Sequence, residues 1–344
     1  MINWSHLALD ILKSNFRNLK YPYRLFLVVT KSCGSRCKYC KIWQEEIKNE
    51  LNLDEYERIA KNTKWLKWLN ISGGEPTDRD DLPQIISAFK KYCPNLLITN
   101  FTSNGLRPEI INQQVSQIAS LRIPKFHINI SIDGPPSIHD NLRGINGNFD
   151  NAIEALAMVR RIKNVESSAA MTIYPKNIEH IQETFDSIKK RIKDFSPSDM
   201  HFNLPHTSPH YYGNSEMIFS PPSEAIYKVE EFINRYPHKF SGLYVVEKIY
   251  RNLAKSYIAN KKTPLPCSAV MTSVYISEKG IVHPCTIWDN PMGNLKEYDY
   301  NLKALLDNKI AINARESAES LKCPQCWTPC EAFPTILSNL VGVT

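Results

Sequence analysis

Two hydrophobic periods alternate along the chain. Short apolar runs typical of buried strands are followed by segments in which apolar residues recur every three to four positions, as on one face of a helix. The predicted strands are 25–30, 68–72, 96–101, 126–132, 169–174 and 200–203, and the predicted helices lie near 53–62, 81–91, 108–119, 149–162 and 177–193. Alternating strands and helices form a parallel sheet with right-handed crossovers. Six repeats are too few for a closed eight-stranded barrel, so the pattern predicts an α/β fold with a partial (β/α)6 barrel.

The residues before the first strand carry an amphipathic helical pattern. Its apolar positions are Trp4, Leu7, Ala8, Ile11, Leu12, Phe16 and Leu19, and its basic positions are Lys13, Arg17 and Lys20. Most such helices cover the core of a domain, and we favour that interpretation. A helix that lies on a membrane surface is the alternative.

A different organisation follows the sixth strand. The polar loop 204–213 and its neighbourhood contain His201, His206 and His210, whose spacing fits no helix face, so we expect substrate contacts or an ordinary loop there and not a metal site. Helices are predicted near 223–235 and 243–258, followed by a hairpin of 270–277 and 281–285 whose turn contains Gly280. We therefore divide the chain into an N-terminal helix (1–22), a barrel (23–240), and a linker helix with a small C-terminal domain (241–344).

Composition and charge restrict the function. The 344 residues carry a formal net charge of +7 without long runs of like charge, which weakly favours an anionic partner and argues against nucleic acid. No apolar run approaches the roughly 18 residues of a membrane span, and no signal peptide is evident, so we expect a cytoplasmic protein. The nine cysteines are mostly clustered, a pattern that in such a compartment indicates metal ligation and not disulfides.

The first cysteine cluster directly follows the first predicted strand. Cys33, Cys37 and Cys40 fall in one loop, close enough to bind one centre. Three thiolates are one fewer than the usual set for a [4Fe–4S] cluster, which leaves one iron open to another ligand. A zinc site would need a fourth Cys or His nearby, and the first histidine after Cys40 is the distant His127.

This Cys-x3-Cys-x2-Cys loop resembles the signature of the radical S-adenosylmethionine (radical SAM) superfamily. The resemblance implies a [4Fe–4S] cluster on Cys33, Cys37 and Cys40 whose open iron binds SAM, and reductive cleavage of SAM to a 5′-deoxyadenosyl radical. Gly73-Gly74-Glu75-Pro76, after the second strand, is similar to the family motif whose backbone binds the SAM amino group.

Further resemblances fall at the ends of later strands. They imply cofactor contacts from Ser103 and Asn104, from Ser131, Asp133 and Arg143 (to the SAM ribose or carboxylate), from Thr172 and Asn203 (near the adenine), and from Tyr39 (packing near the adenine). Other interpretations stay open for two of them: Arg143 as a surface salt bridge and Asp133 as a turn cap.

The C-terminal part contains a second group of thiols. Cys267 and Cys285 flank the predicted hairpin, and Cys323, Cys326 and Cys330 follow; on spacing alone they suit zinc as well as iron. The pattern resembles the SPASM/twitch extension of radical SAM enzymes. Full SPASM domains carry about seven cysteines, so the five here imply one auxiliary [4Fe–4S] cluster in a twitch-like domain. All five are candidate ligands, and the Cys-x2-Cys spacing favours Cys323 and Cys326 beside the hairpin pair. Cys330 is then either an unligated thiol or a replacement for one of its neighbours, so whether Cys323 or Cys330 is the odd cysteine stays open.

The resemblance implies an oxidoreductase-like radical SAM enzyme that removes a hydrogen atom from a substrate carbon and passes an electron to the auxiliary cluster. A small polar or saccharide-type substrate is favoured, with ferredoxin or flavodoxin as the reducing partner and Asp289 as a candidate acid–base group, although a surface carboxylate is the simpler role for Asp289. The alternatives are a peptide maturase, modification of a lipid precursor, and an epimerase. Only about 22 residues precede the first strand, which leans against a leader-peptide domain. Outside this class, an iron–sulfur electron carrier or a zinc-stabilised binding protein stays open.

Overall fold

A computed structural model describes residues 4–217, 224–236 and 242–342. Six parallel strands run in the order of the sequence: β1 (Arg24–Val28), β2 (Trp68–Ser72), β3 (Ile98–Ser103), β4 (Lys125–Ser131), β5 (Glu166–Thr172) and β6 (Met200–Asn203). The helices that connect or follow these strands are α2 (Leu53–Lys61), α3 (Leu82–Tyr92), α4 (Pro108–Ser120), α5 (Pro136–Arg143), α6 (Asn148–Val159), α7 (Ile181–Arg191) and α8 (Pro209–Tyr212). The predicted α/β fold with a six-stranded partial barrel is confirmed.

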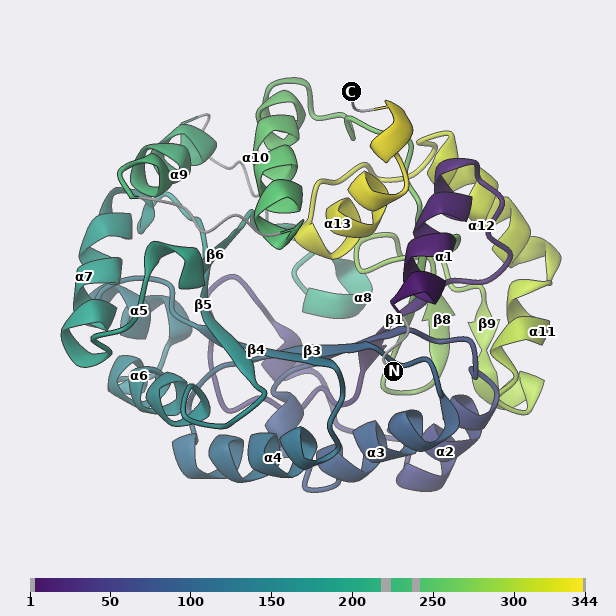
Figure 1. Cartoon of the computed structure of the whole chain (residues 1–344), viewed down its shortest axis with the longest axis horizontal. Coiled ribbons are helices and arrows are strands. Elements are labelled where there is room, and N and C mark those ends of the chain that lie inside the picture. Colours follow the sequence, from purple (N-terminus) through teal and green to yellow (C-terminus); the bar gives the residue numbers. More distant parts are fainter. Residues whose placement is uncertain (1–3, 218–223, 237–241, 343–344) are drawn as a thin grey trace.

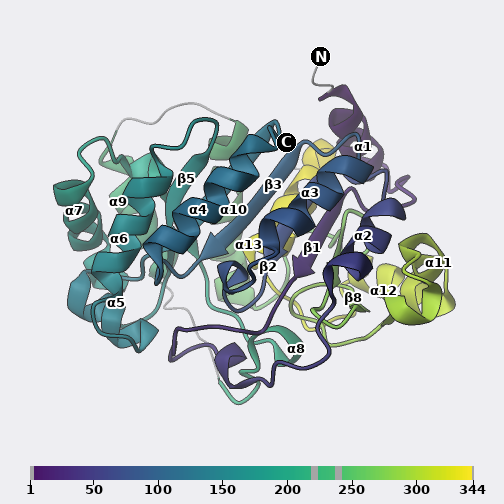
Figure 2. The same ribbon diagram turned by 90° about the horizontal axis from the view of Figure 1, so that it is seen from below.

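The curved sheet separates an apolar layer from a more polar one. Alternate strand residues such as Leu27, Ile71 and Ile128 belong to the large core formed with the helices. Figure 1 shows α2, α3, α4 and α6 along the outer face of the sheet, and Figure 2 shows α3 and α4 in front of the strands, running roughly along them. The remaining strand positions, including Asn70, Asn100 and Asn129, face the opposite side.

The C-terminal segment extends the barrel sheet. β7 (Ser273–Ile276) pairs in parallel with β1, and β8 (Ile281–His283) and β9 (Gly293–Asn294) follow in antiparallel pairs, so one sheet has the order β6-β5-β4-β3-β2-β1-β7-β8-β9. The helices of this half are α9 (Ala225–Asn234), α10 (Gly242–Asn260), α11 (Leu302–Leu306), α12 (Lys309–Glu319) and α13 (Pro329–Leu337). The division at residue 240 stays a prediction, because the sheet is continuous across it.

The N-terminal helix does not bury its apolar stripe. In α1 (Ser5–Asn15), Leu7 packs with Leu19, Tyr23, Leu97 and Met271. Trp4, Leu12 and Phe16, however, are 43%, 52% and 67% exposed. The expectation that the stripe covers the core is therefore wrong for most of its residues, because the helix packs through the narrow side that carries Leu7 and Ser14.

This placement predicts a contrast in stability between two faces of α1. Leu7→Ala should lower the free energy of unfolding by about 2 kcal/mol or more, because it opens a cavity in a buried cluster. Leu12→Ser and Phe16→Ser should each change it by less than about 0.5 kcal/mol, as exposed substitutions do. Urea unfolding measures all three, and a cost for Phe16→Ser equal to that of Leu7→Ala would contradict the packing described here.

No helix in the described ranges is both long enough and apolar enough to cross a membrane.

Candidate active site

The three cysteines of the first cluster lie in the loop after β1. The loop is fastened to the end of α5, because the Arg36 and Lys38 amides donate to the carbonyl oxygens of Arg143 and Leu142 at 2.9 and 3.0 Å. The Arg36 guanidinium also donates to the carbonyls of Cys33, Gly34 and Ser35 at 2.9–3.2 Å. The backbone itself therefore holds the loop in a shape that brings the thiols together.

The chemistry of these thiols fits an iron–sulfur cluster. Burial is the main cause that raises the pKa of Cys33 and of Cys40 to about 12, with smaller contributions from Glu75 at Cys33 and from the neighbouring thiols at both. Two donors approach the sulfurs from other loops: Asn104 Nδ2 lies 3.8 Å from Cys33 Sγ, and Arg143 Nη1 lies 3.8 Å from Cys37 Sγ. A neutral thiol is a weak hydrogen-bond acceptor, so it would stabilise these donors little. A metal-bound thiolate is a better acceptor, and such hydrogen bonds adjust the reduction potential of the cluster.

The paired glycines let the cluster loop close against the loop after β2. A Cβ on Gly73, whose φ is +148°, would lie 2.4 Å from the Thr30 carbonyl oxygen, and one on Gly74 would lie 2.1 Å from that of Ser32. The Gly74 and Glu75 amides donate to these same oxygens at 2.8 and 2.7 Å. Since the amides are engaged, the motif can offer a ligand its carbonyl oxygens, which are the groups that an ammonium group needs.

Glu75 joins the loops inside the protein. Its buried carboxylate accepts from the amide and hydroxyl of Thr77 and, at 2.6 Å, from the amide of Asn104. Pro76 begins the short helical turn Pro76–Asp78 and is also buried. The predicted cofactor roles of Glu75 and Pro76 stay predictions; the visible role of Glu75 is to position Asn104 against Cys33.

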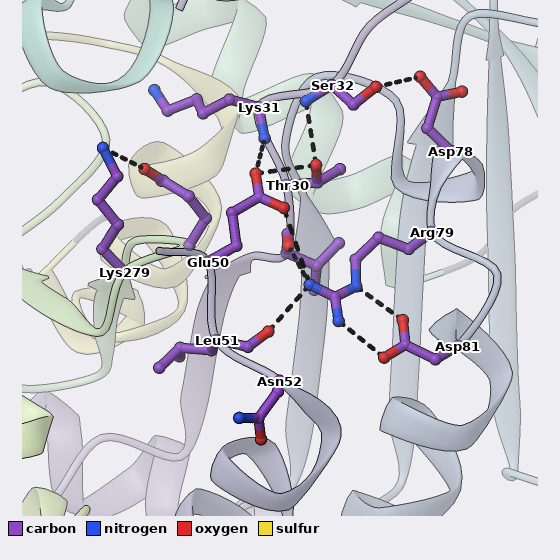
Figure 3. A network of polar contacts seen from close by, with 12 residues as sticks. Thr30, Lys31, Ser32, Glu50, Leu51, Asn52, Asp78, Arg79, Asp81 and Lys279 are labelled. Carbon is purple, nitrogen blue, oxygen red and sulfur yellow. Dashed lines mark hydrogen bonds and ion pairs between the residues drawn. The ribbon is translucent and has the colours of Figure 1, made fainter. Parts of the chain in front are cut away.

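A polar network that sequence reasoning missed anchors the base of the cluster loop (Figure 3). Glu50 accepts from the Thr30 hydroxyl at 3.0 Å and from the Lys31 amide at 2.8 Å. Arg79 lies beside Glu50, donates to the carbonyls of Val29 and Leu51, and forms a two-pronged ion pair with Asp81. Nothing in the local spacing of these residues indicated that they meet.

Ser32 continues this anchoring and borders a cavity. Its hydroxyl donates to Asp78 at 2.8 Å, and Asp78 pairs with Arg107. The cavity, of about 300 Å³, is lined by Ser32, Gly34, Thr77, Asp78, Asn104, Leu106 and Arg107. Because Gly34 and Asn104 adjoin Cys33, the outer side of the cluster loop is reachable through it.

Asp133 and Arg143 form a buried ion pair in place of the surface salt bridge considered for Arg143. Arg143 Nε lies 2.7 Å from Asp133 Oδ2, and both side chains are buried. Asp133 Oδ2 also accepts from the Tyr39 hydroxyl, and Oδ1 accepts from the Thr172 amide at 2.9 Å. The carboxylate raises the pKa of Arg143 well above its usual value against the effect of burial, so a permanent positive charge lies beside Cys37.

Tyr39 and Thr172 also surround Asp133, as do His139, which has no predicted role, and Asn177, which the family resemblance places near the adenine. The Tyr39 ring stacks on Tyr174 with centroids 4.5 Å apart. His139 Nδ1 accepts from the Asp133 amide at 3.1 Å, and Asn177 donates to the carbonyls of Asp133 and Thr172, each at 2.8 Å. His139 could have been suspected, since it follows the Asp133 motif within six residues.

The other predicted cofactor residues lie at the carboxyl edge of the sheet. Ser103 is buried and accepts from the Gly105 amide at 3.2 Å, and Ser131 is buried at the end of β4. Asn203 ends β6, and its carbonyl accepts from the Ile173 amide at 2.9 Å. The structure thus places these residues at one edge with the cluster loop, and their contacts with a cofactor stay predictions.

The buried ion pair predicts an effect on stability as well as on SAM binding. Arg143→Ala should lower the free energy of unfolding by about 3–5 kcal/mol, because it leaves Asp133 buried without its counter-charge. Arg235→Ala, which breaks the exposed pair with Glu231, should cost about 0.5 kcal/mol or less. Urea unfolding compares the two variants.

Affinity for SAM gives the second measurement on Arg143. Arg143→Lys keeps the charge opposite Asp133 but loses the forked donor geometry, so it should fold and bind SAM less tightly. Unchanged SAM affinity in folded Arg143→Lys, with Arg143→Ala as stable as Arg235→Ala, would contradict both roles.

Three of the five C-terminal cysteines pack in one side-chain cluster, and a fourth, Cys323, is near enough to interact electrostatically with Cys267 and Cys326. Cys285 belongs to a side-chain cluster to which Cys267 and Cys326 are packed. Burial raises the pKa of Cys326, and the proximity of Cys267 and Cys323 raises it further. Backbone amides also point at two sulfurs, from Ala269 to Cys267 Sγ at 3.4 Å and from Trp288 to Cys285 Sγ at 3.3 Å.

Cys330 lies in a different environment. It packs with Cys33 and Cys40 in the cluster around Phe26 and Tyr211, and its carbonyl accepts from Arg24. Cys330 therefore packs against the same apolar cluster as Cys33 and Cys40 and not against the one that holds Cys267, Cys285 and Cys326.

Asp289 follows Cys285 on the hairpin side of the protein. Its carboxylate is about half exposed and lies 3.5 Å from His283 Nδ1. This placement does not test its predicted acid–base role.

Comparison with known proteins points to the same family as the cysteine loop. Residues 27–188 match the family model described as "Radical SAM superfamily". The chain is 25% identical over 167 residues to the Fe-coproporphyrin III synthase of Methanosarcina barkeri. The aligned region is 47% of this chain and 40% of that protein. It is 22% identical over 303 residues to the sporulation killing factor maturation protein SkfB of Bacillus subtilis. This aligned region is 80% of this chain and 63% of that protein.

A solved structure shares the fold over most of the chain. SuiB of Streptococcus suis bound to S-adenosylmethionine aligns with a TM-score of 0.63 at 16% identity, covering 96% of this chain and 76% of that one. At this identity the likeness concerns the fold alone. The matches to the two curated relatives span only 40% and 63% of those proteins' lengths.

Proposed function

Because residues 27–188 match the radical SAM superfamily model, we propose that the chain is a radical SAM enzyme that cleaves S-adenosylmethionine at a [4Fe–4S] cluster held by Cys33, Cys37 and Cys40. The observation that carries the proposal is the grouping of three thiols on one loop, with Asn104 and Arg143 directed at two of the sulfurs. When bound, the cluster supplies the electron that splits the SAM sulfonium and yields a 5′-deoxyadenosyl radical, which takes a hydrogen atom from the substrate.

The chain's own residues prepare this reaction by position and charge. Arg143, neutralised on one side by Asp133, presents its remaining donors toward Cys37 and toward a carboxylate bound beside it. The Gly73 and Gly74 carbonyls offer acceptors for an ammonium group. The network of Glu50 and Arg79 fixes the loop, so that little reorganisation is needed when the cofactors bind.

An auxiliary [4Fe–4S] cluster on Cys267, Cys285, Cys323 and Cys326 is the second part of the proposal. It is supported by the grouping of these thiols and by the amides that point at Cys267 and Cys285. A cluster there would accept the electron left on the substrate radical after hydrogen abstraction, while a proton leaves the substrate to solvent or a nearby base, giving net two-electron oxidation. Both clusters would need a reducing compartment and an electron donor such as ferredoxin or flavodoxin.

The concave side of the sheet favours a polar substrate. Its side chains form a hydrogen-bonded series: Asn100 donates to Asn70 at 2.9 Å, and Ser168 donates to Asn129 at 2.8 Å. Thr102 lies on β3, which has strands on both sides, and yet its side chain is exposed, so the sheet faces open space here. A hydroxyl-rich small molecule or saccharide would exchange hydrogen bonds with this surface.

A peptide is the second candidate substrate. SkfB, whose name describes a maturation protein, matches 80% of this chain. Peptide amides and carbonyls would satisfy the same asparagine and serine side chains.

The test is anaerobic incubation of reconstituted protein with SAM, a reductant and candidate substrates of both classes. Formation of 5′-deoxyadenosine is expected, with a rate that rises when the right substrate is present. If protein with its full iron content forms no 5′-deoxyadenosine with any of these substrates, the proposed function is wrong. Stimulation by peptides and not by polyols would choose the second candidate.

A further inference from the structure

We propose that His210, His283 and Asp289 form a mononuclear site for a divalent transition-metal ion, separate from both cysteine groups. His210 lies on α8, His283 on β8, and Asp289 six residues further along the chain. One ligand atom from each lies within 4.8 Å of the others. Two imidazoles and one carboxylate are a donor set typical of zinc or iron(II), with positions left open for water or another oxygen ligand.

The orientation of His210 is that of a metal ligand. Its Nε2 lies 3.0 Å from the Cys285 carbonyl oxygen, a contact in which the ring nitrogen donates. A proton on Nε2 leaves the lone pair on Nδ1, and Nδ1 is buried without a hydrogen-bond partner in the part of the chain that the structure describes. Metal-bound histidines are held in this way by their second nitrogen.

His283 adds a second nitrogen in need of a partner. The side chain is only 6% exposed, and its buried Nδ1 makes no hydrogen bond with any described residue. The separation of 3.5 Å between this nitrogen and Asp289 Oδ1 is close to the roughly 3.4 Å expected between two ligands of a tetrahedral zinc ion with bonds of about 2.0–2.1 Å. Two unpaired buried nitrogens are costly unless something binds them.

The surroundings allow an ion to enter and to be held. The two rings stack at 4.2 Å with an interplanar angle of 10°, so binding requires the His283 ring to rotate toward the ion while His210 keeps its hydrogen bond to the Cys285 carbonyl. Asp289, about half exposed, gives a route from solvent. The nearby Lys31 ammonium donates to the carbonyl oxygens of His210 and Tyr211 at 2.8 and 3.0 Å and not to the rings.

Zinc binding by the reconstituted holoprotein tests this site, because zinc can be counted apart from cluster iron. Equilibrium dialysis against micromolar zinc, followed by elemental analysis, should give one zinc per chain with unchanged iron. Asp289→Asn and His210→Gln should each weaken zinc binding by at least about tenfold, the smallest loss typical for disturbing such a site. Glu183→Gln, which alters the exposed His180–Glu183 pair, should leave it unchanged.

Three results would overturn the site. They are no zinc uptake, uptake that both variants share with the unmodified protein, and uptake accompanied by an equal loss of iron, which would place zinc on the thiols. Circular dichroism of Asp289→Asn, whose substitution is at an exposed side chain, confirms that the variant is folded.

A second and independent observation concerns the exposed face of α1, and the geometry points to an anionic lipid surface as its partner. At about 100° per residue, Trp4, Leu12, Phe16 and Leu9 fall within an arc of about 140°. All four are exposed by 43% or more. The C-terminal Leu340 and Val341, 40% and 62% exposed, lie beside them, because the Val341 amide donates to Asn15.

The positive charges beside this apolar face favour an anionic lipid surface as its partner. The exposed Lys13 borders the apolar arc, and the exposed Lys20 follows the helix. Apolar and aromatic residues beside lysines are the composition of helices that lie in the interface of membranes containing anionic lipids. A purely apolar protein partner would not need the lysines.

Co-sedimentation with vesicles tests this surface. The protein should bind vesicles containing phosphatidylserine, bind pure phosphatidylcholine weakly, and lose binding in high salt. The double variant Leu12→Ser with Phe16→Ser should bind at least about tenfold more weakly, whereas Tyr227→Ser, an equally exposed apolar site on α9, should not. Equal binding by the double variant would overturn the proposal, as would self-association that the double variant abolishes, since that assigns the face to a second copy of the chain.

Discussion

A variant in which Cys33, Cys37 and Cys40 are all replaced by alanine is expected to lose SAM cleavage completely and to keep about four of about eight irons. The three thiols belong to one loop and to one centre, whereas the C-terminal thiols form another group some 230 residues further along the sequence. Removing the first group should therefore leave the second intact. Iron analysis and 5′-deoxyadenosine measurement after anaerobic reconstitution check both halves of the result.

Cys93→Ala is the matched control for that variant. Cys93 is fully buried between α3 and β3 and donates to the Thr63 carbonyl at 3.3 Å, away from both groups. It should lose no iron and keep SAM cleavage. Loss of all iron from the triple variant would contradict two independent centres, and stoichiometric zinc in the unmodified protein with no visible absorption would contradict iron altogether.

The barrel could be predicted because its helices and strands have different hydrophobic periods. The predicted ends of the strands were less accurate, because the inner face of the barrel is polar. β5 begins at Glu166, three residues before the predicted start, because Glu166, Ser167 and Ser168 carry no apolar signal. The helix α5 was not expected at all: its eight residues include a proline and several polar side chains. Strands that face an open, polar interior are therefore hidden in part from a search for apolar runs.

The cysteine groups could be predicted because their spacing is local, and residues that meet across the fold could not. His210 and His283 stack although 73 residues separate them. The expectation that the histidines of 201–210 bind no metal was based only on the spacing of these histidines along the sequence, and it did not consider His283. Likewise, the periodicity of α1 identified a helix but not which of its faces packs, because Trp4, Phe16 and Leu7 contribute equally to an apolar pattern.

The second large effect is expected from single cysteine variants of the C-terminal group. Cys267→Ala, Cys285→Ala, Cys323→Ala and Cys326→Ala should each lose about four irons, because a cluster without an open iron takes four protein thiolates. Cys330→Ala should lose none. Iron content and visible absorption after reconstitution measure all five variants under one protocol.

The reason for setting Cys330 apart is its packing. Its side chain lies against the cluster of Phe26 and Tyr211 that Cys33 and Cys40 also contact, while its carbonyl is bound by Arg24 from the first strand. To ligate the auxiliary cluster, Cys330 would have to leave this packing and displace one of the four proposed ligands. Loss of iron in Cys330→Ala, with retention in Cys323→Ala, would show that this exchange takes place and that Cys323 is the free thiol. If neither variant loses iron, the fourth ligand comes from outside the five, and the proposed ligand set is wrong.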